Sequence, residues 1–204
     1  MTTKSLTLSL DEQQSIPLGT VAGTLGHLGM DIRPLASSGL CSFDPGFANT
    51  AGCTSAISWI DTENSVLLHR GYPVDQLARQ CDFLEVAWIL LQGDAPDEAS
   101  YQAFKNTIPR HSLVHEQIAR MCGSFRRDSH PMALMCALVG TLAAFYHDVL
   151  DVENPEHRAL AATRLLSKMP TLAAMSYKFS IEQPAQYPRN DLSYAGNFLH
   201  MLFA

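Results

Sequence analysis

Positively charged and hydrogen-bonding side chains recur at helical spacing in the second half of this chain. Arg164 and Lys168 are four residues apart, so on a helix they face the same side with like charge. Such a pair costs about 0.2–0.5 kcal/mol unless an anion lies between or opposite the two side chains. Residues 110–112 (Arg-His-Ser) and Tyr146 add a guanidinium, an imidazole, a hydroxyl and an aromatic ring. Together these groups can hold a phosphate and stack on a base.

The same spacing has a simpler interpretation. Arg164 and Lys168 can be solvated and paired with acids on the surface, and from the spacing alone this second interpretation is preferred. Both interpretations place the two cations on one helix face.

A metal site is not predicted. His111 and His115 share a helix face if the helix begins that early, but a serine follows His111 where a zincin has glutamate. The sequence also lacks the P-loop, the GxSxG elbow and the GxGxxG fingerprint. The glycines of residues 23–29 suit a turn-rich segment better than a nucleotide loop.

A second pair of histidines is better explained by helix capping than by catalysis. His130 and His147 bound an apolar segment, and Asp128 and Asp148 stand beside them. Acids favour helix starts and histidines suit the last helical turn. The sequence shows no third residue that would orient either pair for catalysis.

Helical elements must position these side chains, because the periodicity beyond Tyr72 is helical. Apolar residues from Phe83 recur at i, i+3, i+4, i+7 and i+8 and stop at Gly93, which is typical of an amphipathic helix. Pro170 is expected to break or kink the longest helix, and Asp191 to cap the last one. The predicted helices cover 73–80, 83–92, 97–110, 115–125, 129–147, 155–181 and 191–204.

The first part of the chain has a different character. Leu6, Leu8 and Leu10 alternate with small polar residues, as in a half-buried strand. Residues 55–61 and 65–71 read as two strands around a polar turn, and glycine and proline punctuate residues 17–46. We therefore predict a β-rich region over 1–70 and a helical domain over 71–204.

Composition limits the classes of function. The 204 residues are 47% hydrophobic, with 20 acidic and 14 basic residues and a formal charge of −6. Nucleic-acid binding as the main role is not expected, because neutralising phosphates needs a basic face. A few local cations can still hold a small polyanion.

The five cysteines form no CxxC pair, and the N-terminus does not resemble a signal peptide. Free thiols in a reducing cytoplasm follow from this pattern. The longest apolar run, 133–146, is shorter than the roughly 20 residues that cross a bilayer, so it is read as a buried core helix and no membrane is expected.

The chain ends on an apolar sequence, Met201 to Ala204, without a glycine cap or a polar tail. A C-terminal helix docked on the core would explain this ending. The alternative expectation is a chain cut short, whose continuation covers these side chains.

Several long collinear blocks resemble citrate synthase, in particular the type found in Gram-negative bacteria. The resemblance runs from about residue 20 to the end. It is carried by FDPGFANTAGCTSAISWID (43–61), LLHRGYPVDQLA (67–78), RHSLVHEQIAR (110–120), FRRDSHPMALM (125–135), FYHDVLDVENPEHR (145–158), RLLSKMP (164–170) and YPRNDLSYAGNFL (187–199).

The resemblance implies a mainly α-helical fold, with helices of the large citrate synthase domain preceded by a small β-rich region, and a fold that is incomplete in this chain. It also implies a homo-oligomer, a dimer or a hexamer, inhibited by NADH at a site away from the catalytic cleft. This outweighs the preference for solvated cations. The positions that match the family's NADH site are Arg110, His111, Ser112, Tyr146, Arg164, Lys168 and Asn190, with Ser112 in place of the more usual threonine.

The family's reaction condenses acetyl-CoA with oxaloacetate and hydrolyses the thioester, without a further cofactor. The resemblance places the aspartate and histidines of this chemistry downstream of residue 204, so no catalytic residue is assigned and the chain alone is expected to be inactive. A non-catalytic module that binds NADH or mediates oligomerisation is the alternative. 2-Methylcitrate synthase shares the fold but usually lacks the long N-terminal region.

Overall fold

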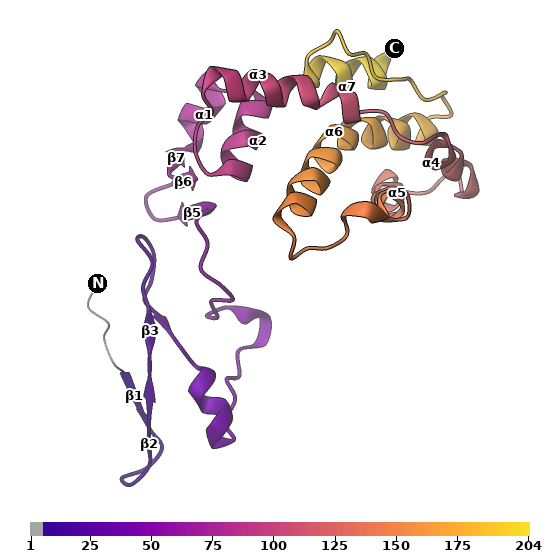
Figure 1. The fold of residues 1–204 in the computed structure, drawn as a ribbon. Helices are drawn as coiled ribbons and strands as arrows, with labels where there is room; N and C mark the ends of the chain where they lie inside the picture. The colour runs from indigo at the N-terminus through magenta and orange to yellow at the C-terminus, as the bar shows by residue number, and fades with distance from the viewer. Residues whose placement is uncertain (1–5) are drawn as a thin grey trace. The chain divides into compact units, whose positions relative to one another are not determined.

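The computed structural model describes residues 6–204, which divide into two compact units, the first ending at Gln80 and the second spanning Cys81–Ala204. The first consists mainly of small sheets and the second of helices (Figure 1). The predominantly helical fold class is confirmed. Residues 1–5 of the predicted β-rich region lie outside the described residues.

Short antiparallel pairs build the N-terminal unit. The strands predicted around Leu6, within 55–61 and within 65–71 are confirmed. The elements are β1 (Leu6–Ser9) paired with β2 (Ser15–Leu18), β3 (Thr20–Val21) paired with β4 (Gly29–Met30), a sheet of β5 (Ser58–Asp61), β6 (Val66–His69) and β7 (Tyr72–Pro73), the 3-10 turns η1 (Arg33–Ser38) and η2 (Pro45–Phe47), and the helix α1 (Val74–Gln80).

The predicted helix start at Pro73 is shifted by one residue. Pro73 ends β7, an edge strand, and α1 begins at Val74. Proline has no N–H to donate, so an edge strand tolerates it. The polar turn before β6 is held by the Asp61 carboxylate, which accepts hydrogen bonds from the Glu63 and Asn64 amides at 3.1 Å each.

Six α-helices make the second unit, several of them capped by a side chain that accepts a hydrogen bond from the first turn, such as Asp97 and Asn154. Asp191 is not the cap of the last helix; Ser193 is, and Asp191 pairs with Arg189 instead. The elements are α2 (Phe83–Gln92), α3 (Glu98–Thr107), η3 (Pro109–His111), α4 (Glu116–Met121), η4 (Cys122–Ser124), α5 (Pro131–Phe145), η5 (His147–Val149), α6 (Pro155–Ser180) and α7 (Tyr194–Phe203).

The core of this unit lies between α4, α5 and α6. Its buried members are Ile118, Cys122, Leu138, Leu142, Leu172 and Met175. The expectation of a buried core helix over 133–146 holds for one face of α5. Every fourth residue of α5 from Leu134 to Leu142 is buried, while Cys136 and Gly140 on other faces are exposed. No helix within residues 6–204 combines the length and the apolar character needed to cross a bilayer.

Pro170 does not break α6, which runs from Pro155 to Ser180. Its ribbon changes direction part-way along its length (Figure 1). Proline deprives the carbonyl four residues earlier of its helical donor. That carbonyl belongs to Leu166, and the hydroxyl of Tyr194 on α7 donates to it at 2.9 Å. The sequence that bends α6 therefore also docks α7 against it.

Candidate functional site

The predicted cations meet at the end of α5, where Tyr146 lies beside α6. The Arg164 guanidinium lies 4.8 Å from the centre of the Tyr146 ring, and the Lys168 ammonium lies 5.0 Å from it. One aromatic ring thus faces both cations, an arrangement in which the ring quadrupole attracts each of them. We call Tyr146, Arg164 and Lys168 the cation cluster.

Arg164 already has an anionic partner. Its two terminal nitrogens donate to the two carboxylate oxygens of Asp148 at 3.0 and 3.1 Å, and only 18% of its side chain is exposed. This hydrogen bonding holds the pKa of Asp148 below its usual range. The carboxylate itself is more exposed than the guanidinium, at 57%. Asp148 therefore supplies the anion that offsets the like charges of Arg164 and Lys168.

Lys168 is buried and has a structural role. Its ammonium donates to the backbone carbonyls of His111 and Leu113, at 2.6 and 2.5 Å. These carbonyls lie at the last residue of η3 and two residues beyond it, where no helix donor is available to them. Lys168 therefore fastens the segment after η3 to α6. The simpler interpretation, solvated cations paired with surface acids, holds for Arg164 in its pairing with an acid and fails for Lys168, which is buried.

Residues 110–112 differ in how far each side chain is exposed to solvent. Arg110 is exposed. His111 is half-buried; burial lowers its pKa first, and the charges of Lys168 and Arg164 lower it further, so the imidazole is neutral at pH 7. Ser112 is buried, and its hydroxyl donates to the Pro109 carbonyl at 2.7 Å.

Two cavities of the helical unit are lined by five of the seven predicted residues. A cavity of about 210 Å³ is lined by the cation cluster and by aliphatic side chains of α5 and α6. A cleft of about 330 Å³ of mixed polar and apolar lining is bordered by Ser112 and Asn190, together with Lys105, Ser167 and Asn197. The structure thus brings Tyr146, Arg164 and Lys168 together and places Ser112 with Asn190 in the second cavity.

Asp148 is the residue of this site that sequence reasoning misassigned. The sequence grouped it with His147 as a cap, whereas it pairs with Arg164, 16 residues away. No local pattern connects the two positions. The available signal was only that Asp148 lies two residues after Tyr146, within η5.

The histidines confirm the capping interpretation at His130. Its Nδ1 accepts a hydrogen bond from the Met132 amide at 3.1 Å, and Asp128 pairs with Arg126. His115 caps α4 in the same way, through the Gln117 amide. No group of three or more potential metal ligands occurs within residues 6–204.

Comparison with known proteins assigns the family. Residues 46–204 match the family described as citrate synthase, C-terminal domain. The chain belongs to the citrate synthase family. All seven positions of the predicted site fall within the matched range, and residues 6–45 fall outside it.

Solved structures agree with this assignment. Citrate synthase from Pyrobaculum aerophilum superposes with a TM-score of 0.72 at 29% identity over 78% of this chain. Citrate synthase from Thermotoga maritima superposes with a TM-score of 0.67 at 25% identity over 79% of this chain. The Thermoplasma acidophilum enzyme, in a ternary complex with carboxymethyl coenzyme A and oxaloacetate, gives 0.73 at 21% over 79%, which shows the shared fold. The chain spans 42% of the length of each of these proteins.

Proposed function

We propose that this chain is the N-terminal portion of a citrate synthase of the Gram-negative type, whose complete enzyme condenses acetyl-CoA with oxaloacetate to give citrate and CoA. The observation that carries the proposal is the family match over residues 46–204. The β-rich region before residue 46, outside that match, supports the Gram-negative type. The chain alone is inactive in this proposal, because no catalytic residue is assigned to it.

A thiol-release assay tests the catalytic part. The 204-residue chain is mixed with acetyl-CoA, oxaloacetate and a thiol reagent, and free CoA is followed by absorbance. We expect no release above the rate of the reagents alone. Turnover by the purified chain would overturn the proposal of inactivity. Release of CoA with propionyl-CoA and oxaloacetate, but not with acetyl-CoA and oxaloacetate, would point to 2-methylcitrate chemistry.

We further propose that the cation cluster belongs to an NADH site of the regulatory kind. An adenine or nicotinamide ring fits beside Tyr146 in the aliphatic cavity, and the phosphates fit Arg164, whose guanidinium suits a phosphate as well as a carboxylate. Arg110, His111, Ser112 and Asn190 complete the proposed site. In this arrangement the ligand phosphate competes with Asp148 for Arg164.

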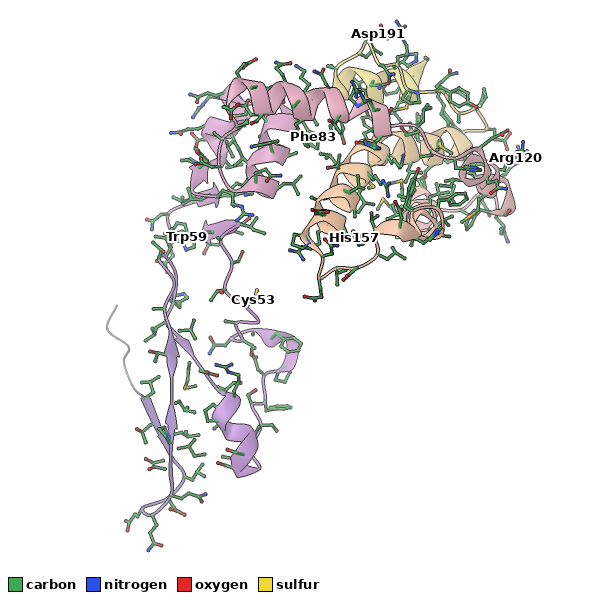
Figure 2. The ribbon with its side chains drawn as sticks, viewed as in Figure 1. Cys53, Trp59, Phe83, Arg120, His157 and Asp191 are labelled. Carbon is green, nitrogen blue, oxygen red and sulfur yellow. The ribbon has the colours of Figure 1, made fainter. Side chains whose placement is uncertain are left out.

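This competition gives a test with effects in opposite directions. Arg164→Gln removes a charge-assisted contact of about 1.5–3 kcal/mol, so NADH affinity measured by its fluorescence is expected to fall by roughly 10–100-fold. Asp148→Asn removes the competitor and is expected to tighten binding. Arg120→Gln, a change at an exposed guanidinium at the surface of α4 (Figure 2), is the matched control and leaves binding unaltered. No NADH binding, or equal binding by all variants, contradicts the proposed site.

The same proposal includes a homo-oligomer in the cytoplasm. The exposed small residues of α5, among them Cys136 and Gly140, permit close approach of another helix. The cysteines Cys41, Cys53, Cys81, Cys122 and Cys136 are free thiols, as suits a reducing compartment. Sedimentation of the purified chain tests the oligomer, and a monomer at micromolar concentration would contradict it.

A non-catalytic module is the second candidate. The feature that favours it is a cation cluster formed wholly within this chain, without any assigned catalytic group. NADH binding by the 204-residue chain, combined with no thiol release above the rate of the reagents alone, would favour the module, and absence of NADH binding would contradict it.

A further inference from the structure

One edge of the N-terminal hairpin is open. β1 pairs with β2, and no other strand among residues 6–204 pairs with β1. Leu10 donates its N–H to the Gln14 carbonyl at 2.9 Å, which continues the register in which Leu8 faces Ile16. Backbone groups alternate in direction along a strand. Leu8 and Leu10 therefore direct their N–H and C=O groups to β2, and Thr7 and Ser9 direct theirs to the open edge.

The opposite edge of the hairpin is closed by proline. Pro17 of β2 faces Thr7, in the half of the register whose backbone groups point away from the partner strand. Pro17 has no N–H to offer at that outer edge, and proline at an edge prevents further pairing. The hairpin thus accepts another strand beside β1 and resists one beside β2.

The apolar core of the hairpin also stops at β1. Ile16 and Leu18 are 7% and 2% exposed because Leu35 of η1 packs against them. Leu6 and Leu8 lie directly opposite on the same face but remain 39% and 37% exposed. A neighbouring strand at the open edge would continue this core over the leucines of β1.

We propose that β1 pairs antiparallel with β1 of a second copy of this chain, about a two-fold axis at Leu8, so that two hairpins form one four-stranded sheet. With the axis at Leu8, Thr7 of each copy faces Ser9 of the other, and their outward N–H and C=O groups form two hydrogen-bonded pairs. Residues 6–9 are uncharged, so the strand meets itself without repulsion. A closed two-fold contact of this kind satisfies both edges at once.

The family fold does not account for this surface. Residues 6–45 lie outside the range that matches the family, and the solved relatives correspond to 78–79% of the chain. Within residues 6–45 the buried apolar cluster consists of Ile16, Leu18 and Leu35. The inference deepens the proposed homo-oligomer by naming one of its contacts, and it does not depend on the catalytic or NADH proposals, since it concerns backbone pairing in the N-terminal unit alone.

Disulfide trapping tests the register. Cys41, Cys53 and Cys136 are first replaced by serine, because these thiols are exposed. Leu8→Cys then places two sulfur-bearing residues directly opposite, with Cα atoms about 4.5 Å apart, within the range of a disulfide. Leu6→Cys is the matched control on the same strand and face. Its symmetry mate lies four residues away along the strand, roughly 13 Å, beyond disulfide reach.

We expect covalent dimers from Leu8→Cys at a level at least about tenfold above Leu6→Cys after mild oxidation. Equal cross-linking of the two variants, or none in either, would overturn the proposal. A second measurement removes the outward donor: Thr7→Pro is expected to halve the mass of the assembly in sedimentation, while Thr7→Val, which keeps its N–H, retains the mass of the parent chain. An unchanged mass for Thr7→Pro counts against pairing at this edge.

Discussion

Replacing Tyr194 by phenylalanine removes one hydroxyl from the junction between α6 and α7, and the structure indicates its cost. Pro170 leaves the Leu166 carbonyl without a helical donor, and the Tyr194 hydroxyl supplies one at 2.9 Å. The aromatic ring stacks on Phe83 with centroids 4.7 Å apart, and this contact survives the substitution. Only the hydrogen bond is removed.

The expected loss is about 1–2 kcal/mol, because a carbonyl away from water without a donor costs about 1–3 kcal/mol and Leu166 is only half-buried. For a helical unit of this size, that loss lowers the melting temperature by roughly 3–8 °C. If the cause is the missing donor at Pro170, restoring the donor should restore the stability. In Pro170→Ala the backbone N–H returns to the Leu166 carbonyl, so Tyr194→Phe should then cost less than about 0.5 kcal/mol.

Urea unfolding of the four chains, followed by far-ultraviolet circular dichroism, measures the coupling between the two positions. The coupling energy is expected near 1 kcal/mol. If Tyr194→Phe costs the same in both backgrounds to within about 0.5 kcal/mol, the hydroxyl does not replace the donor that Pro170 removes, and the reasoning is refuted.

The same hydroxyl gives a signature at high pH. Burial raises the pKa of Tyr194 to about 12, whereas an unfolded tyrosine titrates near its ordinary value of 10.0. Its contribution to stability is therefore fully present below pH 10 and is lost as the pH rises towards 12. Tyr194→Phe should remove this part of the alkaline loss, while Tyr101, whose pKa is also raised by burial and by its hydrogen bond to Asp82, keeps its own part.

Three further predictions concern single side chains. In Arg164→Gln the pKa of Asp148 is expected to return towards its ordinary value, as measured by NMR titration of the carboxyl carbon. Because the pKa of Asp148 is depressed in the folded chain, the ion pair stabilises the fold above the unfolded pKa, and this contribution is lost as the pH falls. The variant lacks the contribution and should therefore lose less stability in acid. Leu138→Ala, at a fully buried core position, is expected to cost about 2–5 kcal/mol in urea unfolding, against less than about 0.5 kcal/mol for the exposed Cys136→Ala on the same helix; similar costs would contradict the assigned core. Asp97→Ala removes the carboxylate that accepts from the first turn of α3 and is expected to cost about 1 kcal/mol, with Asp97→Asn close to the parent chain.

Local sequence patterns predicted the helices, strands and turns correctly where a single residue type determines where an element starts or ends. The apolar stripe from Phe83 to Gly93 ends where glycine adopts φ of 99°, a conformation that favours glycine, and the structure places α2 there. Strand alternation at Leu6 and the turn after Asp61 are equally local. The start of α7 was misplaced because Asp191 and Ser193 are both good caps, and only the pairing of Asp191 with Arg189 decides between them.

The contacts of the site could not be predicted in this way, because its partners are distant in sequence. Lys168 reaches carbonyls 55 and 57 residues away, and Tyr194 reaches one 28 residues away. Backbone carbonyls carry no residue-type signal, so no pattern identifies Lys168 as their donor. The sequence could indicate that two cations share a face, but which of them remains available depends on the path of the chain after η3.

Arg164 and Lys168 differ in their partners, and this difference determines which of them is available to a ligand. Lys168 gives two hydrogen bonds to the backbone and is buried, so its loss would disturb the segment 111–113 whether or not an anion binds. Arg164 instead forms an ion pair with Asp148, whose side chain is 57% exposed. The Asp148 carboxylate therefore has room to rotate into solvent if another anion binds Arg164. In the proposed site a phosphate would therefore displace Asp148 from the guanidinium and leave the backbone contacts of Lys168 in place. In the proposed NADH site, variation at Arg164 and Asp148 would therefore change binding, whereas variation at Lys168 would first change the fold.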